Sequence, residues 1–188
     1  MNLDDMLSYN EQFVTNKNYK PYQTDSVPNK RTVIFTCMDA RLVELLPKSL
    51  NIQNGDVKMV KNAGAILRHP FDSAMKSILV AIYALKAEQV MVIGHHDCGM
   101  SHMEPAAFEQ AMLEKGISGD SIDTLKNAGI NLEGEFRGFD SVEESVRESV
   151  SIVRSHPLLP SYVRVHGLVI DPKTGKVDLV TKGSPGQP

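Results

Sequence analysis

The chain has 188 residues, of which 41% are hydrophobic, so it can form a substantial core, and its length suits a single domain over residues 1–188. Its 20 basic and 23 acidic residues leave a formal net charge of −3, which argues against a nucleic-acid partner. No apolar run approaches the roughly 20 residues needed to cross a bilayer, and the acidic N-terminus lacks the apolar segment of a signal peptide. We therefore expect a cytoplasmic protein without membrane contact.

The first part of the chain, residues 1–30, is expected to be a helical arm followed by a linker. The apolar residues of its first half repeat at helical spacing and fall on one stripe, which contains Leu3, Met6, Leu7, Phe13 and Val14. Pro21 and Pro28 then bracket a polar connector. Such a helix could pack on its own domain, or it could lie across a second subunit.

Short apolar runs and helical patterns alternate in the next part of the chain. The runs are too short for helices and apolar enough to be strands covered on both faces, and they occupy residues 32–36, 57–60 and 89–94. Between them, residues 41–50 predict a helix limited by Pro47, and residues 72–86 predict a longer helix. This alternation is typical of a parallel sheet built through right-handed crossovers.

The following segment changes character along its length. Residues 105–115 predict a helix with a proline in its first turn. Residues 116–140 are polar and rich in glycine, so we expect mostly loop there, with room for a short helix near Ile122 and Leu125.

The last part of the chain completes the predicted sheet. Ser141 and Glu144 form a capping box that starts a further helix. Residues 162–170 and 176–180 are expected to form an antiparallel hairpin, and residues 183–188 a loose tail. The whole pattern predicts an α/β fold: a mainly parallel four-stranded sheet flanked by helices, with an antiparallel C-terminal edge strand and the N-terminal helical arm.

The chain contains only two cysteines, Cys37 and Cys98, too few for a disulfide scaffold. Isolated cysteines are often plain buried core residues. Here, however, Cys37 directly follows the first predicted strand, and Cys98 closely follows the third. The carboxyl ends of neighbouring parallel strands share one edge of the sheet, so the two thiols can meet there.

One histidine beside Cys98 would complete a set of three metal ligands. Two thiolates and one imidazole suit zinc, and three protein ligands leave a fourth position free for water, as in catalytic sites. A closed zinc finger would need a fourth ligand, and the sequence has no CxxC pair. His95 and His96 both lie near enough, and spacing alone does not choose between them.

Asp39 should project from the same side as Cys37, and Arg41 follows it two residues later. The carboxylate could accept a hydrogen bond from a metal-bound water, or it could bind the metal as a fourth ligand. A bidentate pair with Arg41 would keep it ionised and away from the metal. The alternative is an ordinary ion pair that caps the helix starting near Arg41. The Asn62–Gly64 turn ends on the same edge and could offer backbone N–H groups to a small substrate.

The segments CMDAR (37–41) and GHHDCG (94–99) resemble the CxDxR and HxxC motifs of the β-carbonic anhydrases, and the chain looks closest to their small, archaeal-type branch. The resemblance implies one zinc ion per subunit, held by Cys37, His95 and Cys98. It also implies that Asp39 and Arg41 form the catalytic dyad. By the same resemblance, the protein is a homodimer or higher homo-oligomer with active sites at the interface and the N-terminal helix reaching across it.

The function implied by this resemblance is the zinc-dependent reversible hydration of carbon dioxide to bicarbonate and a proton by zinc-bound hydroxide. Ile34 stands where some relatives have a tryptophan linked to a closed form, which implies an open site here. Two alternatives remain from the sequence: a hydrolase of carbonyl sulfide or carbon disulfide from the same family, and a non-catalytic zinc module in which Asp39 is a permanent ligand.

Overall fold

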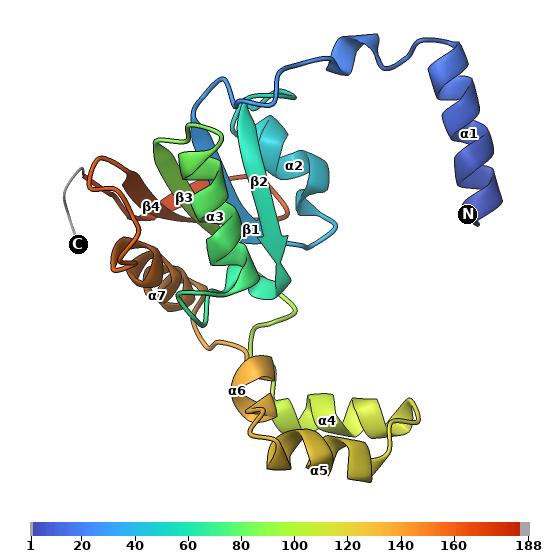
Figure 1. Ribbon diagram of the computed structural model, residues 1–188, viewed down its shortest axis with the longest axis vertical. Coiled ribbons are helices and arrows are strands. Elements are labelled where there is room, and N and C mark those ends of the chain that lie inside the picture. The colour runs from blue at the N-terminus through green and yellow to red at the C-terminus, as the bar shows by residue number, and fades with distance from the viewer. Residues whose placement is uncertain (1, 185–188) are drawn as a thin grey trace.

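The computed structural model describes residues 2–184 and contains one five-stranded sheet with the strand order β2-β1-β3-β4-β5 (Figure 1). The strands are β1 (Thr32–Cys37), β2 (Val57–Asn62), β3 (Gln89–His95), β4 (Arg164–Ile170) and β5 (Val177–Thr181). The first four run parallel, and β5 pairs antiparallel with β4. The predicted sheet is confirmed, including its antiparallel edge.

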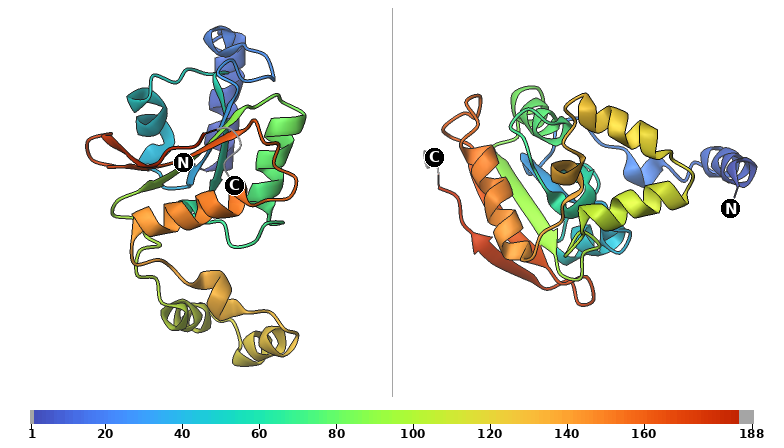
Figure 2. Two further views of the ribbon diagram at one scale, coloured as in Figure 1. Left: turned by 90° about the vertical axis from the view of Figure 1, so that its left-hand side faces the viewer. Right: turned by 90° about the horizontal axis from the view of Figure 1, so that it is seen from below.

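Helices cover both faces of this sheet, as the uninterrupted apolar runs predict (Figure 2). The helices that pack on it are α2 (Leu42–Ser49), α3 (Ser73–Tyr83) and α7 (Val142–Arg154). Val33 and Phe35 of β1 belong to the core beneath α3 and α7, whereas Ile34 points to the opposite face and packs with residues of α2. Alternate side chains of a strand point to opposite faces of the sheet, and helices cover both faces here. All six residues of β1 are therefore buried.

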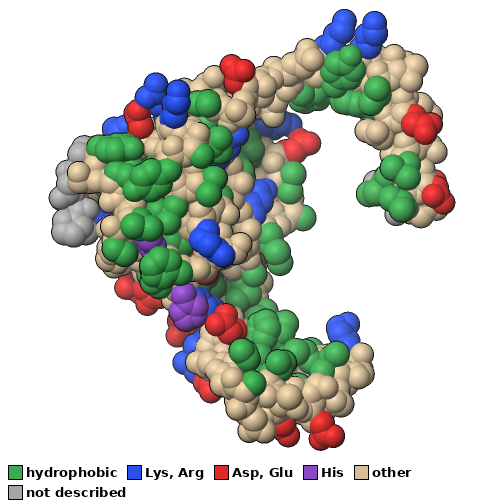
Figure 3. Space-filling view, viewed as in Figure 1, with side chains coloured by type: hydrophobic (Ala, Val, Ile, Leu, Met, Phe, Trp, Pro, Cys, Tyr) green, Lys and Arg blue, Asp and Glu red, His purple; other side chains and the backbone are tan. Residues whose placement is uncertain are grey.

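The N-terminal helix α1 (Leu3–Thr15) stands away from the sheet, as Figure 1 shows. Asn2 and Asp5 form a capping box at its start, and a 3₁₀ turn, η1 (Lys20–Tyr22), lies in the linker that follows. None of the residues of α1 is buried, and Leu3, Met6, Leu7 and Val14 are each more than half exposed. Apolar side chains are visible on the surface of this arm in Figure 3. The predicted helical arm is therefore present, and apart from a contact between Phe13 and Tyr22 of the linker it stands free of the sheet.

Residues 116–140 contain two helices: the short helix expected near Ile122 and Leu125, and a second helix in a part of the segment where loop was wrongly expected. These are α5 (Gly119–Asn127) and α6 (Leu132–Phe136), which form a small helical group with α4 (Pro105–Glu114) at one end of the sheet (Figure 1). The side chains of Ser118 and Asn131 cap the starts of α5 and α6. Phe136 stacks on Phe108 of α4 with ring centroids 4.3 Å apart.

A second difference concerns Pro47, which does not end its helix. Helix α2 continues through Pro47 to Ser49. A proline inside a helix removes one hydrogen bond to the carbonyl four residues earlier, here that of Val43. Val43 is exposed, so water can satisfy this carbonyl.

The two ends of the chain complete the description. Of the predicted tail at 183–188, residues 185–188 lie outside the described residues. Within residues 2–184, no helix combines the length and apolar character needed to cross a membrane.

Candidate metal centre

Cys37, His95 and Cys98 meet at the carboxyl edge of the sheet. Cys37 is the last residue of β1 and His95 the last of β3, and these strands are parallel neighbours. The three side chains are 5%, 1% and 6% exposed, and one possible ligand atom from each lies within 4.8 Å of the others. The two Sγ atoms are 3.9 Å apart, well beyond the length of a disulfide bond. The structure thus brings the two predicted cysteines together as free thiols.

The orientation of the two histidines distinguishes them. His95 Nδ1 donates a hydrogen bond of 2.8 Å to the carbonyl oxygen of His96, because a carbonyl can only accept. Its Nε2 is therefore an acceptor, and this buried atom has no hydrogen-bond partner among residues 2–184. His96, in contrast, is exposed. A buried imidazole with one nitrogen fixed by a carbonyl and the other free beside two thiols is arranged as a metal ligand.

The contact between the two cysteines favours loss of the proton from Cys37. Contact with the Cys98 thiol lowers the pKa of Cys37 to about 4 against the opposing effect of burial, and His95 and the Gly64 backbone add to the lowering. The same contact raises the pKa of Cys98. Gly64 N–H donates to Cys37 Sγ at 3.3 Å, so the Asn62–Gly64 turn supports a ligand atom, whereas the sequence suggested contact with a substrate. A soft divalent cation such as zinc fits this set of donors.

Asp39 and Arg41 form the bidentate pair that the sequence suggested. Arg41 Nε donates to Asp39 Oδ1 at 3.0 Å, and Nη2 donates to Oδ2 at 2.7 Å. The Arg41 backbone N–H also donates to Oδ1, at 2.9 Å. These contacts hold the pKa of Asp39 at about 2, chiefly through the Arg41 side chain. Asp39 Oδ2 lies 3.7 Å from His95 Nε2, so the carboxylate adjoins the three ligand atoms while its own contacts go to Arg41.

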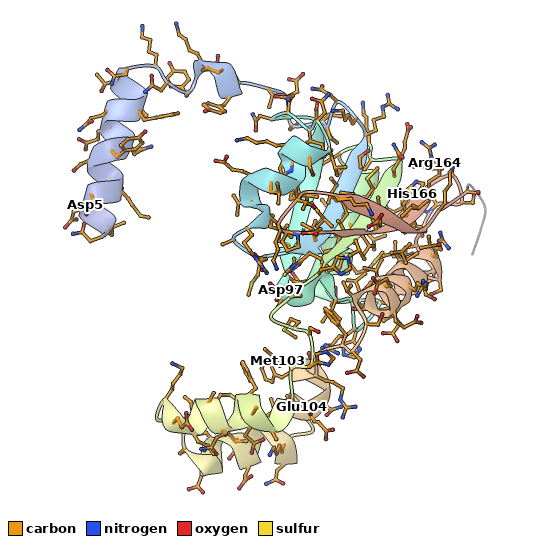
Figure 4. All side chains as sticks on the ribbon, turned by 180° about the vertical axis from the view of Figure 1, so that it is seen from behind. Asp5, Asp97, Met103, Glu104, Arg164 and His166 are labelled. Carbon is orange, nitrogen blue, oxygen red and sulfur yellow. The ribbon has the colours of Figure 1, made fainter. Side chains whose placement is uncertain are left out.

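The structure adds a residue that the sequence analysis missed, Asp97. Arg41 Nη1 donates to Asp97 Oδ2 at 2.9 Å, and Nη2 donates to the Asp97 carbonyl oxygen at 2.7 Å. Asp97 adopts a left-handed backbone conformation with φ 54°, and Figure 4 labels it at the end of the sheet from which the helical group projects. Its place between His95 and Cys98 was the signal available in the sequence, but nothing in the spacing connects it to Arg41.

A cavity of about 270 Å³ adjoins the ligand cluster. Its lining includes His95, Cys98, Phe139 and Asp140. A larger cavity of about 590 Å³ lies along α6 and α7, and none of the candidate ligands lines it. The smaller cavity therefore adjoins two of the three candidate ligands, His95 and Cys98, whereas Cys37 and Asp39 do not line it.

Comparison with known proteins agrees with this arrangement. A sequence model of the family described as carbonic anhydrase matches residues 32–177. YtiB of Bacillus subtilis, whose name assigns it provisionally to the carbonic anhydrases, is 51% identical over 181 residues, which are 96% of this chain and 97% of YtiB. Carbon disulfide hydrolase of Acidithiobacillus thiooxidans is 28% identical over 159 residues, which are 79% of this chain and 77% of that protein.

A solved structure extends the likeness to the whole fold. The crystal structure of β-carbonic anhydrase isoform I from Trichomonas vaginalis matches with a TM-score of 0.86 and 28% identity, covering 98% of this chain and all of that chain. The matched family region includes the sheet edge and the candidate ligands at Cys37, His95 and Cys98. The chain therefore belongs to the β-carbonic anhydrase family.

Proposed function

We propose that this protein catalyses the zinc-dependent reversible hydration of carbon dioxide to bicarbonate and a proton. Cys37, His95 and Cys98 would hold one zinc ion per subunit. The observation that carries the proposal is the buried, unpartnered His95 Nε2 beside two free thiols, with an ionised Asp39 next to it. When bound, zinc would supply a nucleophile near neutral pH by lowering the pKa of water.

Each neighbouring residue has a role that follows from its contacts. Asp39, kept ionised by Arg41, is a hydrogen-bond acceptor that can orient the attacking water. This orientation is useful because two thiolates offset the charge of a divalent metal and so weaken its effect on the water. Gly64 N–H supports the Cys37 thiolate, and the His96 carbonyl fixes the His95 ring. The departing proton then passes to solvent.

The contacts of Asp39 favour this open arrangement over a closed zinc module. A carboxylate that served as a permanent fourth ligand would turn toward the three ligand atoms. Here both of its oxygens accept hydrogen bonds from Arg41 instead. The direction of the Arg41 hydrogen bonds thus supports a vacant fourth coordination position for water.

The proposal is tested by measuring two reactions of the zinc-loaded protein side by side. Stopped-flow measurement of carbon dioxide hydration should show rapid turnover. Incubation with carbon disulfide or carbonyl sulfide, followed by assay of released sulfide, should show far slower turnover. Rapid sulfide release without carbon dioxide hydration would instead assign the protein the activity named for its Acidithiobacillus relative.

We further propose that residues 1–188 work as one unit that assembles into a homodimer or a higher homo-oligomer through the arm at 1–30. This proposal is supported by the arm itself, since α1 has no buried residue although it carries an apolar stripe that includes Leu3, Met6 and Leu7. An apolar helix that is unprotected within its own chain gains stability by packing on a second copy.

A further inference from the structure

Arg41 contacts two aspartates, and the proposed function uses only one of them. We propose that Asp97 is a positioning residue, which fixes the Arg41 guanidinium in the pose that keeps the Asp39 carboxylate off the open coordination position. The inference rests on the proposed metal site and concerns the chain's own residues around it. Asp97 comes from the loop between His95 and Cys98, whereas Asp39 and Arg41 come from the loop after Cys37.

The hydrogen bonds of Arg41 occupy both edges of its planar guanidinium group. The edge formed by Nε and Nη2 faces the two carboxylate oxygens of Asp39. Nη1 faces the carboxylate of Asp97, and Nη2 also reaches the Asp97 carbonyl oxygen. A guanidinium held on one edge alone can still turn about its long, flexible side chain, whereas contacts on both edges fix its plane. Asp39 and Asp97 together therefore clamp the Arg41 guanidinium, and Asp97 supplies the contacts on the second edge.

The backbone of Asp97 explains how both of its acceptors reach the same side chain. Its φ of 54° lies in the left-handed region, which Asp and Asn adopt more readily than most residues. In this turn the Asp97 carbonyl oxygen accepts from Nη2 and the carboxylate accepts from Nη1. A substitution at Asp97 removes the carboxylate contact but keeps the carbonyl contact, so the clamp should weaken without disappearing.

The consequence falls on Asp39 because its carboxylate is close enough to compete for the metal. Asp39 Oδ2 lies 3.7 Å from His95 Nε2, so a small rotation would bring it to the ligand cluster. While Arg41 is fixed, a rotation of the Asp39 carboxylate toward the metal position would break its bidentate ion pair with Arg41. If Arg41 is free to turn, Asp39 can occupy the open coordination position for part of the time. The apparent affinity of any other ligand then falls in proportion to the fraction of molecules in which this position is open.

Two substitutions at Asp97 distinguish the effect of losing the side-chain acceptor from the effects of a changed backbone conformation and of a lost charge. Asp97→Asn keeps a side-chain oxygen and tolerance of the left-handed turn, while Asp97→Gly keeps the turn and removes the side chain. Both remove the same negative charge, so a difference between them is not an effect of net charge. Glu133→Gln is the matched control, because Glu133 is also 69% exposed and pairs with Arg137 far along the chain from the ligands.

The test uses full-length protein loaded with cobalt in place of zinc, and azide as the probe. Azide can fill an exchangeable coordination position, and its binding changes the visible spectrum of cobalt. We expect azide to bind roughly three- to tenfold more weakly to Asp97→Gly than to Asp97→Asn, with kcat of the zinc form lowered by a similar factor. Glu133→Gln should match the wild type in both measurements.

The same comparison in an Asp39→Asn background completes the test. The neutral amide that this substitution introduces is a poor competitor for the metal, so azide affinity should no longer depend on which substitution is present at Asp97. Equal azide affinities of the two single variants, a difference that persists in the Asp39→Asn background, or loss of cobalt from Asp97→Gly would each overturn the role proposed for Asp97. If the wild type binds cobalt and azide but does not hydrate carbon dioxide, the proposed function fails, while the azide comparison still decides the role of Asp97.

Discussion

The ligand cluster and the N-terminal arm are at opposite extremes of burial within the same chain. Cys37, His95 and Cys98 are buried at the carboxyl edge of two paired strands, where the Gly64 N–H donates to Cys37 and the His96 carbonyl accepts from His95. Helix α1 has its own capping box but no buried residue. The fold of this chain brings the candidate metal ligands together, whereas the apolar stripe of the arm is left uncovered by residues 2–184. Metal binding and assembly should therefore respond to different substitutions.

The largest effect is expected from Cys98→Ser. Serine keeps the size of the side chain but offers a much poorer ligand for zinc, so zinc affinity should fall by more than about 100-fold, beyond the range seen when only a supporting residue is lost. Competition with a chelator of known affinity measures this change. The mass of the particle in solution should stay the same. Dissociation of the assembly on loss of zinc would contradict the expectation that metal binding and assembly are independent.

The converse experiment is Leu7→Glu on the arm. Leu7 is exposed in the single chain, and burial of a leucine in a contact stabilises that contact by about 1.5–3 kcal/mol, so association should weaken by roughly ten- to 100-fold. Sedimentation across a concentration series measures it, with Asn10→Glu as a control for added charge on the same helix. Zinc content should remain complete. An unchanged mass at every concentration would show that the arm does not hold copies together.

Gly64→Ala tests whether the turn beside Cys37 can accommodate a side chain. Gly64 has φ 79°, and an added Cβ would lie 2.8 Å from Ile66 Cδ1, so we expect the free energy of unfolding to fall by about 1–3 kcal/mol. Chemical denaturation of the metal-free protein measures this loss. Gly119→Ala is the control, because its Cβ would meet no atom within 4 Å. Equal stability of the two variants would mean that the turn next to Cys37 tolerates a side chain.

A smaller effect follows from the ion pair of Asp39. Its folded-state pKa of about 2 lies below the ordinary value of 3.8, so its contribution to stability is complete above about pH 4 and is lost as the pH falls through about 2. The stability difference between wild type and Asp39→Asn should therefore be constant from neutral pH to about pH 4 and then shrink. Denaturation of the metal-free proteins along this pH series measures it, and a difference that disappears already near pH 6 would contradict the pairing.

The sequence predicted the parts of this molecule that depend on periodicity and on strand ends. The wholly apolar runs before Cys37 and His95 identified buried parallel strands, and their shared edge brought the ligands together. It did not predict the contact between Arg41 and Asp97, because that contact depends on a left-handed turn with no periodic signal. Helix α6 was missed for a similar reason, since a side-chain cap from Asn131 and a contact of Phe136 with Phe108 hold this five-residue helix, which is too short to show an apolar repeat of its own.

The most direct test of the account is stopped-flow carbon dioxide hydration by the wild type and Asp39→Asn, both with full zinc occupancy. If Asp39 orients the attacking water at a site arranged by Cys37, His95 and Cys98, the wild type should turn over rapidly and the variant should lose roughly 100-fold or more in kcat. Equal rates in the two proteins, or no hydration by the fully loaded wild type, would contradict the account.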